Sequence, residues 1–198
     1  MPPAPLVDLA SFPRKALDAN RRWWRNHGRA GAWFFASGTG GRFDLDPPSG
    51  TLYLATTADA AARERIGIDH VRAGVVSAGE VDGRFLSELV LPVTVEAAHA
   101  ATIEGQRWGV VPGELSSTSD YALTRTWARA FAAAGFTAIW SMLRFSAPHG
   151  RGLAVFGDSG PRSWPAPADP LPLRSFVETR MKLTVLDPPH SSTLTVLA

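Results

Sequence analysis

The turn signal at residues 47–50, which read Pro-Pro-Ser-Gly, constrains the fold more than any other feature of the sequence. Proline and glycine in this order cannot continue a helix or a central strand, so the chain has to bend here. Short apolar runs flank the turn at residues 32–36 and 51–55 and are typical of buried strands. Thr57 is then placed to cap a helix over residues 58–66. The order strand, turn, strand, helix predicts a fold in which sheet and helix pack together.

A second helix is expected at residues 121–134, because its apolar side chains recur at helical spacing and Gly135 lies where a C-terminal cap belongs. Ser119 or Thr118 would begin this helix. A basic helix is expected at residues 14–26. Further strands are expected at residues 71–76, 85–91, 136–143, 152–156 and 181–186, and a short helix at 95–106. These elements predict an α+β domain with a largely β core and three to four helices.

Length and composition favour a single domain. The chain has 198 residues, of which 45% are hydrophobic and 19% are charged, as in globular proteins. We divide it into an N-terminal extension with a helix (residues 1–30), a core (31–160) and a tail with the final strand (161–198) that packs on the same domain. The sequence has no cysteine, no apolar run of membrane-spanning length and no signal-peptide pattern. A cytoplasmic protein without membrane association is therefore expected.

The charge pattern argues against direct binding to nucleic acid. The formal net charge is only +2, which gives no strong positive field along one face. Residues 21–25 combine arginines with two tryptophans that could stack on bases, but packing of these tryptophans against the domain is the favoured interpretation. The glycine-rich residues 37–41 lack the lysine of a phosphate-binding loop and the helix of a dinucleotide fingerprint. No metal site is expected, because no metal-ligand spacing joins His27, His70, His99, His149 and His190.

Three equally spaced residues are candidates for chemistry: Arg42, Tyr53 and Glu64, with eleven positions from each to the next. Arg42 follows two glycines, which let a ligand approach the backbone closely, and Tyr53 lies in a strand expected at the centre of the sheet. Glu64 shares a helix face with the small residues Ala60 and Ala61, which leave room for a ligand. Three other interpretations stay open: a solvated arginine in a turn, a core tyrosine, and a glutamate in water on a helix that packs through its opposite face.

Several segments together resemble the RES domain, a bacterial family named for its Arg, Glu and Ser. In chain order they are GGRFD (40–44), LYLA (52–55), AAARE (60–64), DYALTRTWA (120–128) and LAVFG (153–157). The resemblance extends over roughly residues 33–160, so the core at residues 31–160 is interpreted as a RES-like catalytic core. It implies a fold related to that of ADP-ribosyltransferases.

The resemblance also implies an activity and a partner. RES proteins are mostly toxins of toxin–antitoxin pairs, and characterised members consume NAD+ by phosphorolysis or hydrolysis, or transfer its ADP-ribose to a protein. The chain is therefore expected to be a toxin that cleaves the nicotinamide–ribose bond of NAD+, its substrate, with phosphate as an optional co-substrate and no prosthetic group. An antitoxin of the Xre type is the implied partner. A protein ADP-ribosyltransferase and a catalytically weak RES-like binding or regulatory module are the alternatives, and a homo-oligomer is left open.

The site residues follow from the same resemblance. Arg42, Tyr53 and Glu64 fall on the family's arginine, tyrosine and glutamate, which implies that Glu64 and Arg42 are catalytic and that Arg42 and Tyr53 bind NAD+. The family's serine would align with Leu143, so it is displaced or lost in this chain. Ser141, two residues earlier on the same face of a strand, is assigned to NAD+ binding in its place, and Ser146 is the other candidate.

Overall fold

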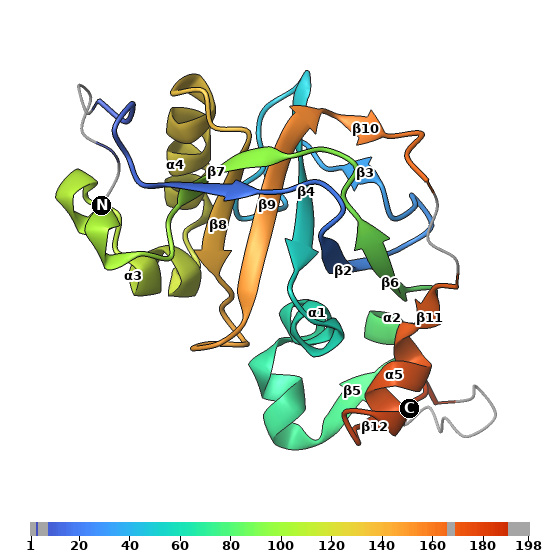
Figure 1. The fold of residues 1–198 in the computed structure, drawn as a ribbon. Helices are drawn as coiled ribbons and strands as arrows, with labels where there is room; N and C mark the ends of the chain where they lie inside the picture. Colours follow the sequence, from blue (N-terminus) through green and yellow to red (C-terminus); the bar gives the residue numbers. More distant parts are fainter. Residues whose placement is uncertain (1–2, 4–7, 166–168, 190–198) are drawn as a thin grey trace, which may run out of the picture.

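A mixed eight-stranded sheet forms the centre of the protein (Figure 1). The computed structural model describes residues 3, 8–165 and 169–189. Within them, β7 and β8 pair in parallel, and the other neighbouring strands of this sheet pair antiparallel. The strands lie side by side in the order β1 (Arg14–Leu17), β7 (Val95–His99), β8 (Ala138–Met142), β9 (Arg151–Asp158), β4 (Ser49–Ala55), β2 (Arg22–His27), β6 (Phe85–Val90) and β11 (Leu171–Pro172).

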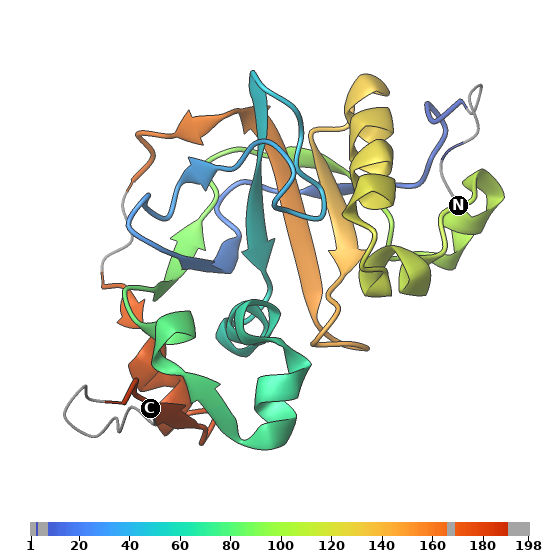
Figure 2. The same cartoon turned by 180° about the vertical axis from the view of Figure 1, so that it is seen from behind.

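The helices and two small sheets surround this central sheet. The described residues contain α1 (Ala58–Ala73), α2 (Ala78–Val81), α3 (Pro112–Ser117), α4 (Tyr121–Ala133), α5 (Leu173–Thr179) and the 3-10 helix η1 (Ile103–Trp108). One small sheet pairs β3 (Phe34–Phe35) with β10 (Gly160–Pro161), and the other pairs β5 (Val75–Ser77) with β12 (Thr184–Leu186). Seen from behind, α4 lies beside β8 and α1 lies at the end of β4 (Figure 2). The α+β class is thereby confirmed, with more short helices than the sequence predicted.

Alternation along the central strands separates the two faces of the sheet. In β4, Leu52 and Leu54 belong to the core cluster around Trp23, whereas Tyr53 packs against the cluster that contains Phe131 of α4. Successive side chains of a strand project to opposite faces, so Tyr53 has to face the helices α1 and α4. The candidate site therefore lies on the helix-covered face.

Helix α1 begins as the sequence predicts. Thr57 is its N-cap and accepts a hydrogen bond from the amide of Ala60 at 3.1 Å. The helix continues beyond the predicted end at residue 66 to Ala73, but Gly67 has φ 78°, which is outside helical geometry and interrupts the regular winding. Between Thr57 and Gly67, the buried side chains of the helix are those of Ala60, Ala61, Ala62 and Ile66. They pack the helix against the sheet beside β4.

Several other sequence predictions are confirmed. Helix α4 occupies the predicted segment, with Gly135 at φ 85° just after its end, although Asp120 and not Ser119 or Thr118 caps its first turn. The predicted strand after the turn at 47–50 is β4, and the predicted segments at 85–91, 136–143 and 152–156 contain β6, β8 and β9.

Two predicted helices are wrong. Residues 14–26 contain β1 and β2 in place of a basic helix, and residues 95–106 begin with β7 and reach η1 only at Ile103. The reason is tertiary: Trp23 is fully buried against Trp140 of β8, with ring centroids 5.8 Å apart, and β2 pairs with β6 along its length. Packing of this kind overrides weak local helix preference. The strand predicted at 71–76 is likewise shortened to β5, because α1 extends to Ala73.

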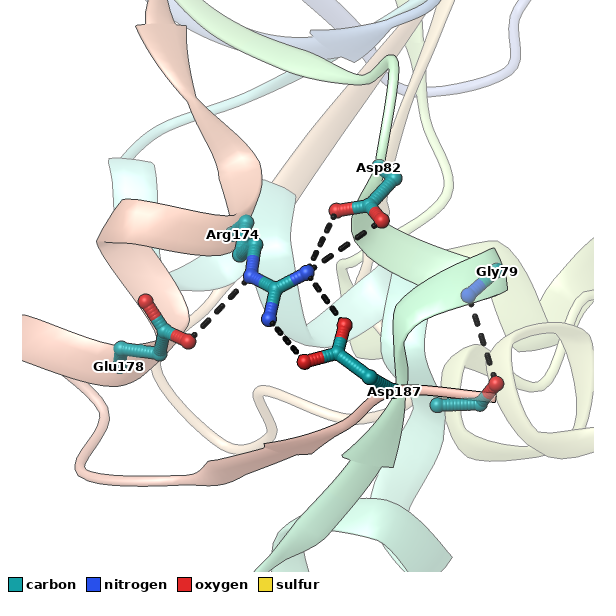
Figure 3. Close-up of polar contacts among 6 residues, drawn as sticks. Gly79, Asp82, Arg174, Glu178 and Asp187 are labelled. Atoms are coloured by element: carbon teal, nitrogen blue, oxygen red, sulfur yellow. Dashed lines mark hydrogen bonds and ion pairs between the residues drawn. The ribbon is translucent and has the colours of Figure 1, made fainter. Parts of the chain in front are cut away.

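Arg174 is the centre of a group of ion pairs in the C-terminal segment (Figure 3). Arg174 of α5 donates two parallel hydrogen bonds to Asp187, at 2.8 and 2.9 Å, and pairs with Asp82 at the end of α2 and with Glu178 one turn later, both at 3.4 Å. The bidentate geometry fixes orientation as well as distance. Arg174 therefore links α5, α2 and the residue after β12. No helix among the described residues is long and apolar enough to span a membrane.

Candidate active site

A cavity of about 500 Å³ opens on the helix-covered face of the sheet. Arg42, Tyr53, Glu64 and Ser141 all line it, although they are far apart in the sequence. Ser146 lies outside this cavity and lines a separate hollow near the start of α1. Cavities of about 300–1,000 Å³ are the usual size of small-molecule sites. The structure thus brings four of the five candidate residues to one ligand-sized space.

Arg42 is anchored at the edge of this cavity by its neighbours. Its Nη1 donates hydrogen bonds to the carbonyl oxygens of Thr118, at 2.8 Å, and Leu115, at 3.2 Å. The guanidinium also lies over the ring of Tyr121, 4.9 Å from the centroid, and the hydroxyl of Thr124 donates to the backbone carbonyl of Arg42. Burial lowers the pKa of Arg42, and the nearby Arg144 lowers it further. In the described part of the chain its hydrogen bonds use Nη1 alone, so Nε and Nη2 are left to bind a ligand.

Tyr53 holds the loop that carries Arg42. Its hydroxyl donates to Oδ1 of Asp44 at 2.7 Å and accepts from the amide of Phe43 at 2.8 Å. Oδ2 of Asp44, which is 2% exposed, accepts from the amide of Gly41 at 2.6 Å. A Cβ atom on Gly41 would lie 2.3 Å from Asp44 Oδ1, so only glycine fits there. Burial and the adjacent Asp44 raise the pKa of Tyr53, which keeps the hydroxyl protonated and able to donate.

Glu64 reaches the cavity from α1, on the side of the helix that also carries Ala61. Its Oε1 accepts a 2.6 Å hydrogen bond from the amide of Phe145, in the turn between β8 and β9. Burial raises the pKa of Glu64, against the opposing effects of the Phe145 and Arg144 amides and of the positive charges of Arg42 and Arg144. The interpretation of Glu64 as a fully solvated glutamate is wrong, since the side chain is half-buried and bonded to the opposite wall of the site.

Ser141 takes the position that strand alternation predicts. It is 6% exposed on β8, pairs across the sheet with Gly152, and lines the cavity together with Leu143 two residues later. A Cβ atom on Gly152 would come within 2.6 Å of Leu143 Cδ2, so the glycine makes room for this leucine. Ser146 has a buried hydroxyl without a hydrogen-bond partner among the described residues, but it borders the other hollow. Of the two serines, Ser141 is the one that lines the cavity with Arg42, Tyr53 and Glu64.

Most of the positive charge of the cavity, and the residue that organises its loop, are not evident from the sequence. Asp44 belongs to the motif at residues 40–44, but no local pattern in the sequence indicates that its carboxylate accepts from the amide of Gly41 and closes the loop. Arg25 belongs to the helix predicted at residues 14–26, whereas the structure has it on strand β2. The full set of arginines that line the cavity is Arg25, Arg42, Arg65, Arg84 and Arg144. No three His, Cys, Asp or Glu residues in the described part of the chain gather to hold a metal ion.

The fold and the cavity define an α+β domain with a positively charged small-molecule site around one carboxylate. The model of the RES domain family matches residues 5–175, and the chain belongs to this family. A chain in the crystal structure of the M. tuberculosis MbcT–MbcA toxin–antitoxin complex has a similar fold, with a TM-score of 0.57 and 15% sequence identity over 83% of this chain and 91% of that one. No curated protein matches the sequence.

Proposed function

We propose that this protein is a RES-type toxin that cleaves the nicotinamide–ribose bond of NAD+, by phosphorolysis or hydrolysis. The observation that carries the proposal is the placement of Glu64 and Arg42 on one cavity in which arginines outnumber carboxylates. An excess of guanidinium groups suits a dinucleotide, whose pyrophosphate is anionic. Membership of the RES family supports the same substrate.

The chemistry requires a negative group beside the ribose. The C1′–N bond breaks and its electron pair goes to the nicotinamide nitrogen, which becomes neutral, while C1′ acquires positive charge as in glycoside cleavage. An oxygen of phosphate or water then bonds to C1′, and any proton that the attacking oxygen must lose goes to solvent. The carboxylate of Glu64, held by the Phe145 amide, would stabilise the charged sugar and accept a hydrogen bond from a ribose hydroxyl.

The other candidates would bind and position the substrate. Arg42 has Nε and Nη2 available for paired hydrogen bonds to a phosphate. Tyr53 contributes its ring to the cavity wall, while its hydroxyl is used to hold the Arg42 loop. Ser141 also lines the cavity and would donate a hydrogen bond to the ligand. Nothing in these roles needs a prosthetic group.

A protein partner belongs to the same proposal. The structural neighbour is a toxin–antitoxin complex, and we infer that a cognate antitoxin, of the Xre type, restrains this chain. Both partners would then act in the cytoplasm, where NAD+ is available. Copurification of a product of a neighbouring gene with this chain, and loss of activity in that complex, would support this part of the proposal.

An assay of nicotinamide release tests the function. Purified protein is incubated with NAD+, with and without inorganic phosphate, and nicotinamide is followed by chromatography. Release that needs phosphate indicates phosphorolysis, and release without phosphate indicates hydrolysis. If NAD+ labelled in its ADP-ribose part is used and the label appears on a protein, the activity is instead that of an ADP-ribosyltransferase. A folded protein that releases no nicotinamide under either condition would overturn the proposal and leave a binding module.

Two variants connect the assay to the site. Arg42→Ala removes the guanidinium at the cavity, and we expect a loss of activity of at least about 100-fold. Arg72→Gln is the matched control, because Arg72 is exposed on the last turn of α1 and its loss changes net charge equally. Near-normal activity of Arg42→Ala would show that the assigned role is wrong.

A further inference from the structure

The turn between β8 and β9, at residues 143–150, holds the carboxylate of Glu64 from the side opposite α1. The amide of Phe145 donates to Oε1 of Glu64 at 2.6 Å. This hydrogen bond and the amide of Arg144 both lower the pKa of Glu64, against the effect of burial. How firmly the carboxylate is held therefore depends on what fixes the turn, and the mechanism above gives no role to the residues that do so.

Gly150 closes this turn. Its amide donates to the carbonyl oxygen of Ser146 at 2.7 Å, and its carbonyl oxygen accepts from the amide of Leu143 at 3.2 Å. A Cβ atom on Gly150 would lie 2.3 Å from the Cβ atom of Ser146 and 2.8 Å from its carbonyl oxygen. Any other residue at position 150 would displace the chain at Ser146, which directly follows the amide that holds Glu64.

Arg151, the first residue of β9, holds the same turn through its side chain. Its Nη1 donates to the carbonyl oxygens of Pro148, at 2.5 Å, and of Gly150, at 3.2 Å. The next residue, Gly152, lines the cavity, so strand alternation directs the side chain of Arg151 to the other face of the sheet. Arg151 therefore lies outside the cavity and acts on it only through the turn.

Arg151 also joins the turn to the helix that carries Glu64. Its carbonyl oxygen accepts from the amide of Thr56 at 3.1 Å, and its amide donates to Oγ1 of Thr56 at 3.4 Å. Thr56 directly precedes Thr57, the N-cap of α1. The start of α1 and the start of β9 are therefore fixed relative to each other, and with them the distance between Glu64 and the amide of Phe145.

We propose that Gly150 and Arg151 are positioning residues for Glu64, which hold the β8–β9 turn so that its amides fix the carboxylate at the cavity. The reaction that Glu64 serves rests on the proposed function, whereas the hold on its carboxylate does not. The charged groups that act on this carboxylate are Arg42, on the loop before β4, and Arg144, on the turn itself. Hydrogen bonds to the charged form lower the pKa of a carboxyl group, so loosening the turn should raise that of Glu64.

Titration of the carboxyl group without turnover tests this role. Protein isotope-labelled at its glutamate carboxyl carbons is titrated by NMR, and the Glu64 signal is identified by its absence from Glu64→Gln. We expect a higher pKa of Glu64 in Gly150→Ala and in Arg151→Gln than in the wild type. Arg151→Lys, which can still donate to a carbonyl oxygen, should restore part of the difference. Arg72→Gln, an exposed change on α1 that removes the same charge, serves as the control and should leave this pKa unchanged.

The two variants together separate positioning from a direct charge effect. Gly150→Ala keeps every charge, so a higher pKa of Glu64 in Arg151→Gln alone would be an effect of charge and would overturn the proposal. An unchanged pKa in both folded variants would also overturn it. Melting temperatures are measured first. If Gly150→Ala does not fold, Arg151→Gln is titrated again at about 1 M salt, which screens charges but does not restore a lost hydrogen bond. A difference that disappears there would likewise overturn the proposal.

Kinetics add a second readout and keep this outcome separable from that of the proposed function. In both variants kcat should fall about tenfold with little change in KM, because Glu64 acts in the transition state. Neither change should lower activity further in a Glu64→Gln protein, since both act through Glu64. A protein that shows the pKa differences but releases no nicotinamide retains the positioning role and loses the reaction. A protein that releases nicotinamide with an unchanged pKa of Glu64 in the variants retains the reaction and loses the positioning role.

Discussion

Two groups of charged residues in this protein have opposite compositions. At the C-terminal segment, three carboxylates surround the single guanidinium of Arg174 (Figure 3). Its pKa is raised, chiefly by the hydrogen bonds to Asp187 and further by Asp82. The cavity is lined by five arginines and by one carboxylate, that of Glu64, and burial lowers the pKa of Arg25, Arg42 and Arg84. Carboxylates outnumber the arginine in the first group, and arginines outnumber the carboxylate in the second.

This difference separates a structural contact from a binding site. The Arg174 group is complete within the chain, so it needs nothing from outside and serves to dock α5 on α2. The cavity group is unbalanced in charge, because five arginines and the single carboxylate of Glu64 line it. Strongly perturbed ionisable groups that line a cavity are typical of functional sites. Changes in the cavity should therefore affect ligand binding and turnover, and changes at Arg174 should affect stability alone.

The largest expected effect is that of Glu64→Gln. Glutamine has the same shape and can still accept the hydrogen bond from Phe145, but it has no negative charge to stabilise the sugar cation. We expect nicotinamide release to fall by about 100-fold or more, with NAD+ still bound. Steady-state kinetics with kcat and KM measured separately provides the check. A Glu64→Gln enzyme with wild-type kcat would remove Glu64 from the chemistry.

The next effect concerns the loop that carries Arg42. Tyr53→Phe keeps the ring but deletes the hydroxyl that joins Asp44 to the amide of Phe43, which leaves the buried Asp44 short of a donor. We expect a loss of stability of about 1–3 kcal/mol, measured by denaturant unfolding. Displacement of Arg42 should lower kcat/KM between about 10- and 100-fold. If stability fell while kcat/KM stayed at the wild-type value, Tyr53 would be a core residue without a positioning role.

A smaller effect concerns pH. Burial raises the pKa of Glu64 above its ordinary value of 4.5, so the catalytic carboxylate is lost on acidification earlier than an exposed glutamate would be. Activity should fall as the pH decreases through this raised pKa. Arg144→Gln removes a positive charge that opposes the shift, and the acid limb of its pH–rate profile should move to higher pH. An acid limb that does not move in this variant would contradict the electrostatic coupling of Arg144 and Glu64.

The same shift has a consequence for stability with a definite sign. A carboxyl group whose pKa is raised by folding favours the folded state at a pH below its unfolded pKa, and this contribution is lost as the pH rises through the folded pKa. Glu64→Gln should therefore unfold at a higher denaturant concentration than the wild type at pH 7, and the difference should shrink at acidic pH. Equal midpoints at pH 7 would show that the carboxylate carries no cost of burial.

The smallest effect is expected at the ion pairs of Arg174. Arg174→Gln removes all three ion pairs of α5, but these side chains are largely exposed and such pairs contribute little. We expect a fall in melting temperature of no more than a few degrees and unchanged kcat/KM, measured by scanning calorimetry and the nicotinamide assay. A large loss of activity in this variant would show that the C-terminal segment communicates with the cavity, and would remove the contrast between the two groups.

The sequence predicted those parts of the fold that depend on local signals. Helix α1 follows from its cap at Thr57, and the end of α4 follows from Gly135, because both signals lie next to the element they determine. Strand β2 has no such signal: Trp23 reads equally well on a helix, and its pairing partner Leu89 is distant in the sequence. Long-range pairing decides in such cases, and a single sequence does not show it.

In the candidate site, too, some residues could be predicted from the sequence and others depend on long-range contacts. The family resemblance supplied Arg42, Tyr53 and Glu64, and the structure places all three on one cavity. Arg25 is not predicted as a site residue, because the local pattern favours a helix where the structure has strand β2. The role of the Tyr53 hydroxyl was also hidden, because only the folded chain brings it to Asp44.

The central claim is that the arginine-lined cavity binds a dinucleotide. Calorimetric titration of NAD+ into Glu64→Gln, which should bind without cleaving, tests it most directly. We predict saturable binding of one NAD+ per chain, weakened at least tenfold when Arg42→Ala is added. A folded Glu64→Gln protein that shows no binding at about 1 mM NAD+, the upper end of usual substrate affinities, would contradict the claim.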